Sequence, residues 1–234
     1  MKRITKKTAK RKPAAEPAAP QKRIFIVDDH PLFREGLGAI IRQQPELCIC
    51  GNADNAVKAF EEIRRLKPDI VVTDIGLPGK SGLELLKDIH AFMPEVPILV
   101  ISMHDEVLYA ERVLKAGARG YIMKQEGPDR ILEAITKVLE GHVYVSGRIS
   151  SEILENLVNR GAKPKASPIA KLSDREFEVF RLLGEGKEGH EIAKDLNLSI
   201  KTVSCHRANI KDKLGIQSGT ALISFASQWV GGES

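Results

Sequence analysis

The chain has 234 residues, enough for one large domain or two small ones, and its 42% hydrophobic and 29% charged residues are ordinary for a folded globular protein. No stretch approaches the ~20 apolar residues that a membrane helix needs, and three cysteines argue against a disulfide framework, so we expect a cytoplasmic protein without membrane contact. The net charge of +5 is concentrated in residues 1–23, which contain nine Lys or Arg and one Glu.

Residues 1–21 form a predicted disordered basic tail. They are rich in Lys, Arg, Ala and Pro and show no apolar periodicity. Two uses remain open for the tail. It could be a solvated segment that aids solubility, or a polybasic arm that adds non-specific affinity for DNA.

Residues 22–146 alternate short apolar runs with longer helical stretches, a pattern typical of repeated βαβ units. Strands are expected at 24–27, 47–51, 70–74, 98–101 and 120–123, and helices at about 31–44, 55–67, 82–92, 107–116 and 128–140. The predicted fold class is therefore α/β, with one flavodoxin-like (βα)5 doubly wound parallel sheet. Cys48 and Cys50, two positions apart on the second strand, are expected to face the same way.

Residues 147–170 are predicted to form a connector helix, at 149–160, and a linker. Residues 171–234 change character and contain helical patterns only. Ser173 and Glu176 form a capping box, and Leu172 and Phe177 stand at the positions of a hydrophobic staple. A short helix is expected at 190–196 and a longer one at 200–214, joined by a tight turn. We predict a small all-α four-helix domain of the helix-turn-helix type.

Polar side chains follow four of the five predicted strands at their carboxyl ends, where an open parallel sheet places its ligand. These side chains are Asp28 with Asp29, Asp74, Ser102, and Lys124. Clustered carboxylates repel one another unless they share a divalent cation, and Mg²⁺ suits such oxygen ligands. A carboxylate beside such a cation can accept a phosphoryl group. Asp74 is the predicted acceptor, with Lys124 pairing with the phosphoryl oxygens and Ser102 donating a hydrogen bond to one of them.

The chain resembles the LuxR/NarL-type (NarL/FixJ) two-component response regulators over about residues 22–230. The resemblance rests on Val27-Asp28-Asp29-His30-Pro31, Asp74-Ile75-Gly76-Leu77-Pro78-Gly79, Ser102-Met103-His104, Gly117-Ala118-Arg119-Gly120-Tyr121-Ile122-Met123-Lys124, Leu172-Ser173-Asp174-Arg175-Glu176, Glu191-Ile192-Ala193 and Lys201-Thr202-Val203-Ser204-Cys205-His206-Arg207-Ala208-Asn209-Ile210.

This resemblance implies a receiver domain in which a sensor histidine kinase phosphorylates Asp74. It also implies that Asp29, Asp74 and the Gly76 carbonyl bind Mg²⁺ directly, with Asp28 acting through water. Ser102 and Tyr121 would be the pair that rearranges on phosphorylation. The phosphorylated protein would then bind double-stranded DNA as a homodimer and control transcription.

The helix at 200–214 would be the DNA-reading element. Val203, Ile210 and Leu214 should pack inward, whereas Lys201, Ser204, Cys205 and Ala208 share another face. The resemblance implies that this face enters the major groove. The DNA-contacting set is then Lys201, Thr202, Ser204, Cys205, Arg207, Ala208, Lys211 and Lys213. Ser204, Cys205 and Ala208 offer no bidentate Arg–guanine contact, which favours readout by apolar contacts, water or DNA shape.

The last helix, at about 220–230, carries two neighbouring rows of apolar residues. Leu222, Phe225 and Trp229 are expected to pack in the core. Ile223, Ala226 and Val230 form the second row, which the resemblance assigns to a dimer partner.

Two alternative functions compete with a phosphorylation-controlled transcription regulator that is not an enzyme. A phosphatase of the haloacid dehalogenase type would need a second Asp two residues after the nucleophile, where this chain has Gly76. A constitutive DNA-binding protein with a degenerate receiver is disfavoured because Asp28, Asp29, Asp74, Ser102 and Lys124 are all present.

Overall fold

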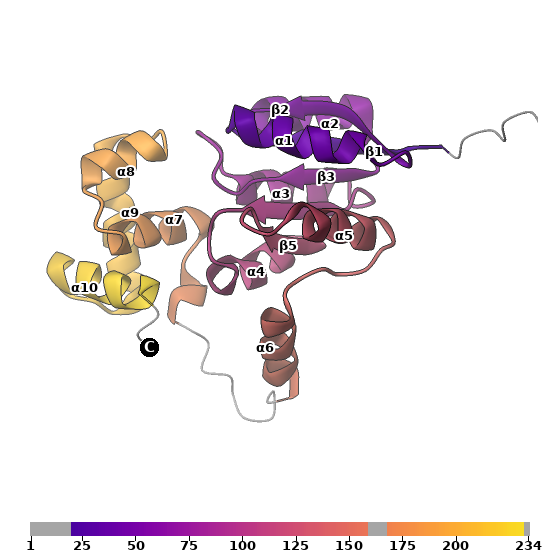
Figure 1. Ribbon diagram of the computed structural model, residues 1–234. Helices are drawn as coiled ribbons and strands as arrows, with labels where there is room; N and C mark the ends of the chain where they lie inside the picture. The colour runs from indigo at the N-terminus through magenta and orange to yellow at the C-terminus, as the bar shows by residue number, and fades with distance from the viewer. Residues whose placement is uncertain (1–19, 159–167, 232–234) are drawn as a thin grey trace, which may run out of the picture.

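A computed structural model describes residues 20–158 and 168–231 of the chain. It contains an α/β unit followed by a helical unit (Figure 1). Most of the predicted basic tail, and most of the predicted linker before Pro168, lie outside the described residues.

The α/β unit is built on one parallel five-stranded sheet with the order β2-β1-β3-β4-β5. Its strands are β1 (Lys22–Val27), β2 (Leu47–Ala53), β3 (Ile70–Thr73), β4 (Ile98–Ser102) and β5 (Gly120–Met123). This strand order is that of the flavodoxin-like doubly wound fold, so the predicted fold class is confirmed. β3 is buried along its whole length because helices cover both faces of a parallel sheet.

Five helices cover the two faces of the sheet (Figure 1). They are α1 (Pro31–Arg42), α2 (Ala56–Leu66), α3 (Gly82–Phe92), α4 (Glu106–Lys115) and α5 (Pro128–Leu139). α1 and α5 contribute Leu37, Ile41 and Ile135 to one buried cluster, and α2, α3 and α4 contribute Ile63, Leu86 and Val113 to the other. Within the described residues no helix is long and apolar enough to cross a membrane.

The helical unit begins after α6 (Gly147–Val158) and a short 3₁₀ turn, η2 (Pro168–Lys171). Its helices are α7 (Asp174–Gly184), α8 (Gly189–Asp195), α9 (Ile200–Leu214) and α10 (Gly219–Val230). The predicted capping box is confirmed: Ser173 Oγ accepts from the Glu176 backbone N–H at 3.4 Å, and the Glu176 carboxylate accepts from the Ser173 N–H at 2.7 Å. Leu172 and Phe177 are both buried, as the predicted staple requires.

The apolar rows of α10 differ in part from the prediction. Leu222 is fully buried and Trp229 packs against Phe177 and Phe180, as expected. In the second row only Ile223 is exposed, whereas Ala226 is buried against α7. A Cβ placed on Gly184 of α7 would lie 2.5 Å from the Ala226 carbonyl oxygen and 2.6 Å from a Val230 methyl group. The backbone of α7 therefore packs directly against α10 at this glycine. The prediction that this row is free for a dimer partner is therefore wrong for Ala226, and it stays a prediction for Ile223 and the partly buried Val230.

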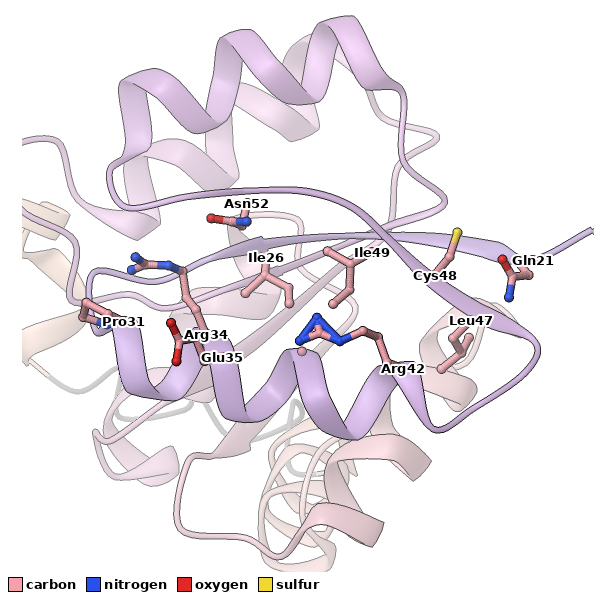
Figure 2. Close-up of a pocket in the computed structure, with 11 residues that line it drawn as sticks. Gln21, Ile26, Pro31, Arg34, Glu35, Arg42, Leu47, Cys48, Ile49 and Asn52 are labelled. Atoms are coloured by element: carbon pink, nitrogen blue, oxygen red, sulfur yellow. The ribbon is translucent and has the colours of Figure 1, made fainter.

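The expectation that Cys48 and Cys50 face the same way stays a prediction, because the strand pairing is irregular between them. The pairing of β1 with β2 shifts by one residue between Ile24 and Phe25, and this bulge leaves Cys50 without a strand partner. Cys50 packs with the cluster under α2, α3 and α4. Cys48 is one of the residues around a hollow between β2 and α1, where its sulfur points away from Arg42 and lies near Gln21 (Figure 2).

Candidate functional site

Four strand ends bring buried polar side chains together at one edge of the sheet. Asp28 follows β1, Asp74 follows β3, Ser102 ends β4 and Lys124 follows β5, and each is almost completely shielded from solvent. The Lys124 Nζ lies 2.6 Å from Asp28 Oδ2 and 2.6 Å from Asp74 Oδ2. One cation thus bridges two buried carboxylates, and it lies 4.6 Å from the centre of the Phe33 ring.

The Asp74 carboxylate is held by the backbone as well as by Lys124. Its Oδ1 accepts hydrogen bonds from the N–H groups of Ile75, at 2.6 Å, and Gly76, at 3.2 Å. Burial alone would raise the pKa of Asp74, but the charge and hydrogen bond of Lys124 outweigh it and hold the pKa below its ordinary value. Asp74 is therefore ionised at neutral pH, the form in which a carboxylate is a nucleophile.

A cluster of four possible metal ligands surrounds Asp74. Ligand atoms of Asp28, Asp29, His30 and Asp74 all lie within 4.8 Å of one another. Asp28 Oδ1 accepts from the His30 backbone N–H at 2.8 Å, while Asp28 Oδ2 is taken by Lys124. The Asp29 Oδ1 atom is shielded from water and makes no hydrogen bond of normal geometry within the described chain. The Nδ1 atom of His30 lies 2.7 Å away from it. The sequence reasoning had given His30 no role.

Ser102 and Tyr121 lie on the neighbouring strands. The Ser102 Oγ accepts from the His104 backbone N–H at 3.4 Å. Tyr121 is fully buried, and its hydroxyl donates to the His104 carbonyl at 2.7 Å. Burial raises the pKa of the Tyr121 hydroxyl, so it remains a hydrogen-bond donor at neutral pH. Both residues therefore contact the backbone at His104, in the segment that leads from β4 to α4.

Gly82 allows the start of α3 to lie against the backbone of Asp74 and Ile75. A Cβ at Gly82 would come within 2.2 Å of the Asp74 carbonyl oxygen and 2.6 Å of the Ile75 Cα. The Gly82 N–H donates to the Ile75 carbonyl at 2.9 Å, which ties the start of α3 to the Asp74 loop. Ser81 and Glu84 add a capping box to the same helix start.

The predicted DNA-reading helix is found with its predicted bounds as α9. Val203 and Ile210 are buried and Leu214 is partly buried, as predicted for the inward face. Lys201, Ser204, Cys205 and Ala208 are exposed on the other side. Three predicted DNA contacts already have intramolecular partners. The Ser204 hydroxyl donates to the Ile200 carbonyl at 3.0 Å, Thr202 Oγ1 lies 2.7 Å from Ser199 Oγ, and Lys213 Nζ lies 2.6 Å from Glu176 Oε2.

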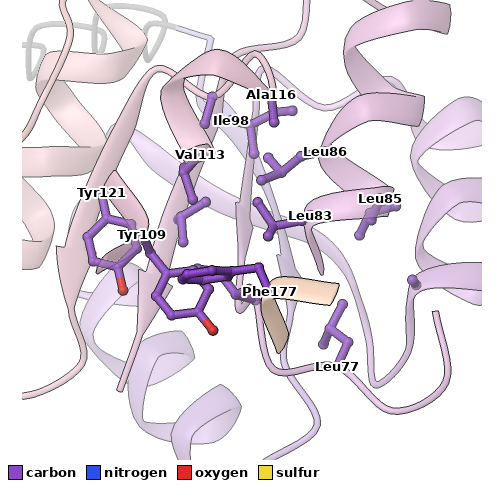
Figure 3. Close-up of a cluster of buried hydrophobic side chains, with 14 of the residues drawn as sticks. Leu77, Leu83, Leu85, Leu86, Ile98, Tyr109, Val113, Ala116, Tyr121 and Phe177 are labelled. Atoms are coloured by element: carbon purple, nitrogen blue, oxygen red, sulfur yellow. The ribbon is translucent and has the colours of Figure 1, made fainter. Parts of the chain in front are cut away.

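The two units also contact each other, which the sequence reasoning missed. Phe177 of α7 enters the buried cluster of α2, α3 and α4 beside Tyr109, with ring centroids 5.1 Å apart (Figure 3). The Arg112 guanidinium stacks on the Phe177 ring at 4.1 Å and donates to the carbonyls of Ile169 and Leu172. Phe177 had been read as the staple of its own helix, and nothing local to the sequence marks its second contact.

Comparison with known proteins agrees with both units. Residues 24–136 match the response regulator receiver domain family, and residues 170–226 match the bacterial regulatory proteins of the luxR family. The oxygen regulatory protein NreC of Staphylococcus aureus is 34% identical over 208 residues, which cover 87% of this chain and 96% of NreC. The chain is a LuxR-family response regulator.

Solved structures support this membership. A LuxR-family two-component response regulator from Aurantimonas sp. SI85-9A1 is 36% identical over 59% of this chain and 99% of its own length, with a TM-score of 0.55. The RcsB response regulator of Salmonella typhimurium is 28% identical over 90% of this chain and 98% of its own length, with a TM-score of 0.63. Members of this family regulate transcription by binding DNA and are not enzymes, so the phosphatase alternative is excluded.

Proposed function

We propose that this response regulator is switched by phosphorylation of Asp74, with the helices of residues 171–234 reading DNA in response. The observation that supports the proposal most strongly is the Lys124 ammonium 2.6 Å from both Asp28 and Asp74. A phosphoryl group on Asp74 would bring oxygens that compete for this cation, because a phosphate is a stronger anionic partner than a single carboxylate oxygen.

Mg²⁺ fits the acidic cluster. Asp29 keeps an oxygen without a hydrogen bond of normal geometry, and Asp74 stands beside it, so these two carboxylates and the Gly76 carbonyl are the proposed direct ligands. Asp28 is already bonded on both oxygens, to the His30 N–H and to Lys124, which suits a role through water. The bound cation would neutralise phosphoryl oxygens that approach the three carboxylates.

Ser102 and Tyr121 are proposed to convey the change at Asp74 to α4. Both contact the backbone of His104, and Arg112 and Tyr109 of α4 hold α7 of the DNA-binding domain. A rearrangement of Ser102 toward a phosphoryl oxygen would therefore disturb the segment on which the domain contact depends.

On the DNA side, α9 is the proposed reading helix. Lys201, Thr202, Arg207, Lys211 and Lys213 would position the domain on phosphates, and Ser204, Cys205 and Ala208 would face base edges. RcsB of Salmonella enterica has been solved bound to promoter DNA in the presence of a phosphomimetic. Another structure contains two RcsB dimers bound to two parallel DNAs. By analogy we propose a homodimer on DNA, a sensor histidine kinase as phosphodonor, and action in the cytoplasm.

Intact-mass spectrometry after incubation with acetyl phosphate and Mg²⁺ tests the acceptor. The parent protein should gain one phosphoryl group that hydroxylamine removes, and Asp74→Asn should gain none. The matched control is Asp69→Asn, which changes a carboxylate just before β3, at the opposite end of that strand, and should be phosphorylated like the parent. Equal phosphorylation of Asp74→Asn would refute the assignment.

A further inference from the structure

The candidate phosphoacceptor lies in the wall of a cavity between the two domains. The cavity has a volume of about 460 Å³. Asp29, Asp74, Ser102 and His104 line it from the receiver side, and Glu178, Arg181 and Lys187 line it from α7 and the segment that follows. The DNA-binding domain thus forms part of the surroundings of Asp74, although none of its residues belongs to the strand-end site.

The size of this cavity suits a small molecule. Volumes of about 300 to 1,000 Å³ are typical of small-molecule sites in proteins. An acyl phosphate fits such a space, so this arrangement of the domains admits a small phosphodonor.

Charge on the DNA-binding wall singles out Arg181. Glu178 is paired with Arg175 at 2.7 Å, and Asp195 is paired with Lys187 at 2.6 Å, so each cavity-lining carboxylate on this wall has a cationic partner. Arg181 pairs with Glu185 through Nη1, but its buried Nε makes no hydrogen bond among the described residues. Arg181 lines the cavity from α7 and His104 lines it from the receiver side, so the guanidinium faces the receiver wall.

We propose that Arg181 of the DNA-binding domain binds the phosphoryl group of a small acyl-phosphate donor opposite Asp74 and so determines specificity for that donor. A guanidinium matches phosphate geometry and can donate to two phosphoryl oxygens at once. In the transfer, an Asp74 carboxylate oxygen forms a bond to phosphorus with its own electron pair. The bond from phosphorus to the acyl oxygen breaks, and its electron pair leaves with the carboxylate product, so no further reactant is consumed.

This inference rests on the proposed role of Asp74, and its test is the rate of phosphorylation of the full-length protein at varied acetyl phosphate concentration and constant Mg²⁺. Arg181→Gln should raise KM by about five- to tenfold, on the scale of one charge-assisted hydrogen bond, with kcat little changed. Arg181→Lys should recover part of the loss, because it restores the charge without the fork of donors.

Two controls separate this role from general charge and from the ion pair on α7. Lys194→Gln removes an exposed charge from α8 that does not line the cavity, and its KM should equal that of the parent. Glu185→Gln removes the partner of Arg181 and should leave KM unchanged or lower it. The inference is overturned if Arg181→Gln has the KM of the parent, or if either control raises KM as much. Phosphorylation of Asp74→Asn would instead overturn the proposed function itself.

Discussion

At the scale of single residues, Lys124 holds the strand-end site together in the absence of a phosphoryl group. Its side chain is 4% exposed and its ammonium bridges Asp28 and Asp74, because burial of these carboxylates without a cation would be costly. The proposed Mg²⁺ would share the same compensating role. Lys124 and the metal should therefore substitute for each other in part.

Lys124→Gln tests this substitution. In EDTA the variant should lose about 3 kcal/mol of unfolding free energy, because two buried carboxylates lose their cation. Added Mg²⁺ should recover more stability in the variant than in the parent, as measured by urea unfolding. Lys22→Gln, which breaks an exposed pair with Asp69 at 3.8 Å, should cost less than about 1 kcal/mol and show no such Mg²⁺ effect. A Lys124→Gln protein as stable as the parent in EDTA would contradict this account.

At the scale of elements, helix starts fix where the functional side chains lie. α3 begins against the Asp74 loop at Gly82, and α7 begins at a capping box whose Glu176 also binds Lys213 of α9. These contacts join a local signal in the sequence to a tertiary contact. The local part could be predicted, and the tertiary part required the structure.

Gly82→Ala should displace the Asp74 loop. The new Cβ would meet backbone atoms at 2.2 and 2.6 Å, and backbone cannot yield as a flexible side chain does. We expect a loss of about 2 kcal/mol in stability, of the order measured for overpacked positions, and slower phosphorylation of Asp74. Gly36→Ala is the control, because a Cβ at this exposed position in α1 meets nothing within 4 Å and should stabilise the helix by about 0.5–1 kcal/mol. Normal stability and phosphorylation of Gly82→Ala would show that the loop can accommodate the added methyl group.

We predict that Glu176 makes a pH-dependent contribution to the stability of the fold. Burial alone would raise its pKa, but Lys213 and the Ser173 N–H outweigh burial and hold the pKa below the ordinary value of 4.5. A depressed carboxyl pKa stabilises the fold above the unfolded-state pKa, and the stability is lost as pH falls through the folded-state pKa.

Glu176→Gln keeps a side chain that can complete the capping box but removes the charge. The variant should be less stable than the parent by about 1 kcal/mol at pH 7, a value discounted for the partly exposed Lys213, and the difference should shrink as pH falls below about 4.5. Thermal unfolding across this pH range measures the effect. The exposed Glu46, which has no ion pair within the described residues, provides the control variant Glu46→Gln. A difference that stays constant with pH would exclude the charge as its cause.

At the scale of the whole molecule, α4 of the receiver holds α7 of the DNA-binding domain while leaving the exposed face of α9 open. Arg112 bonds two backbone carbonyls, stacks on Phe177 and lies 3.5 Å from Asp174, and Lys87 lies 2.6 Å from the same carboxylate. These contacts fix Arg181 in the cavity wall, so domain closure and donor specificity are linked.

Arg112→Ala should loosen the contact, because it removes the stacking on Phe177 and the hydrogen bonds to the Ile169 and Leu172 carbonyls. Small-angle scattering should show a larger radius of gyration than the parent. The KM for acetyl phosphate should rise as it does in Arg181→Gln. Arg119→Ala, which removes an exposed arginine without an ion pair in the described chain, is the control and should match the parent. An unchanged radius of gyration in Arg112→Ala would show that other contacts hold the domains.

The limits of sequence reasoning follow the same scales. Asp28, Asp74, Ser102 and Lys124 could be predicted to converge because each follows an apolar run, and parallel strands end at one edge of a sheet. The buried side of α10 could not be predicted fully, because both of its rows are apolar and only the close approach of Gly184 selects between them. The contacts of Phe177, Arg112 and Arg181 cross between domains, and no periodicity within one segment records them.

The central claim is that phosphorylation at Asp74 controls DNA binding by residues 171–234. The most direct test is the affinity of the full-length protein for an operator selected from random-sequence duplex DNA, measured at fixed salt with and without acetyl phosphate and Mg²⁺. The account predicts that the phosphodonor strengthens binding at least severalfold in the parent and not at all in Asp74→Asn. An Asp74→Asn variant that responds to the phosphodonor as the parent does would contradict it.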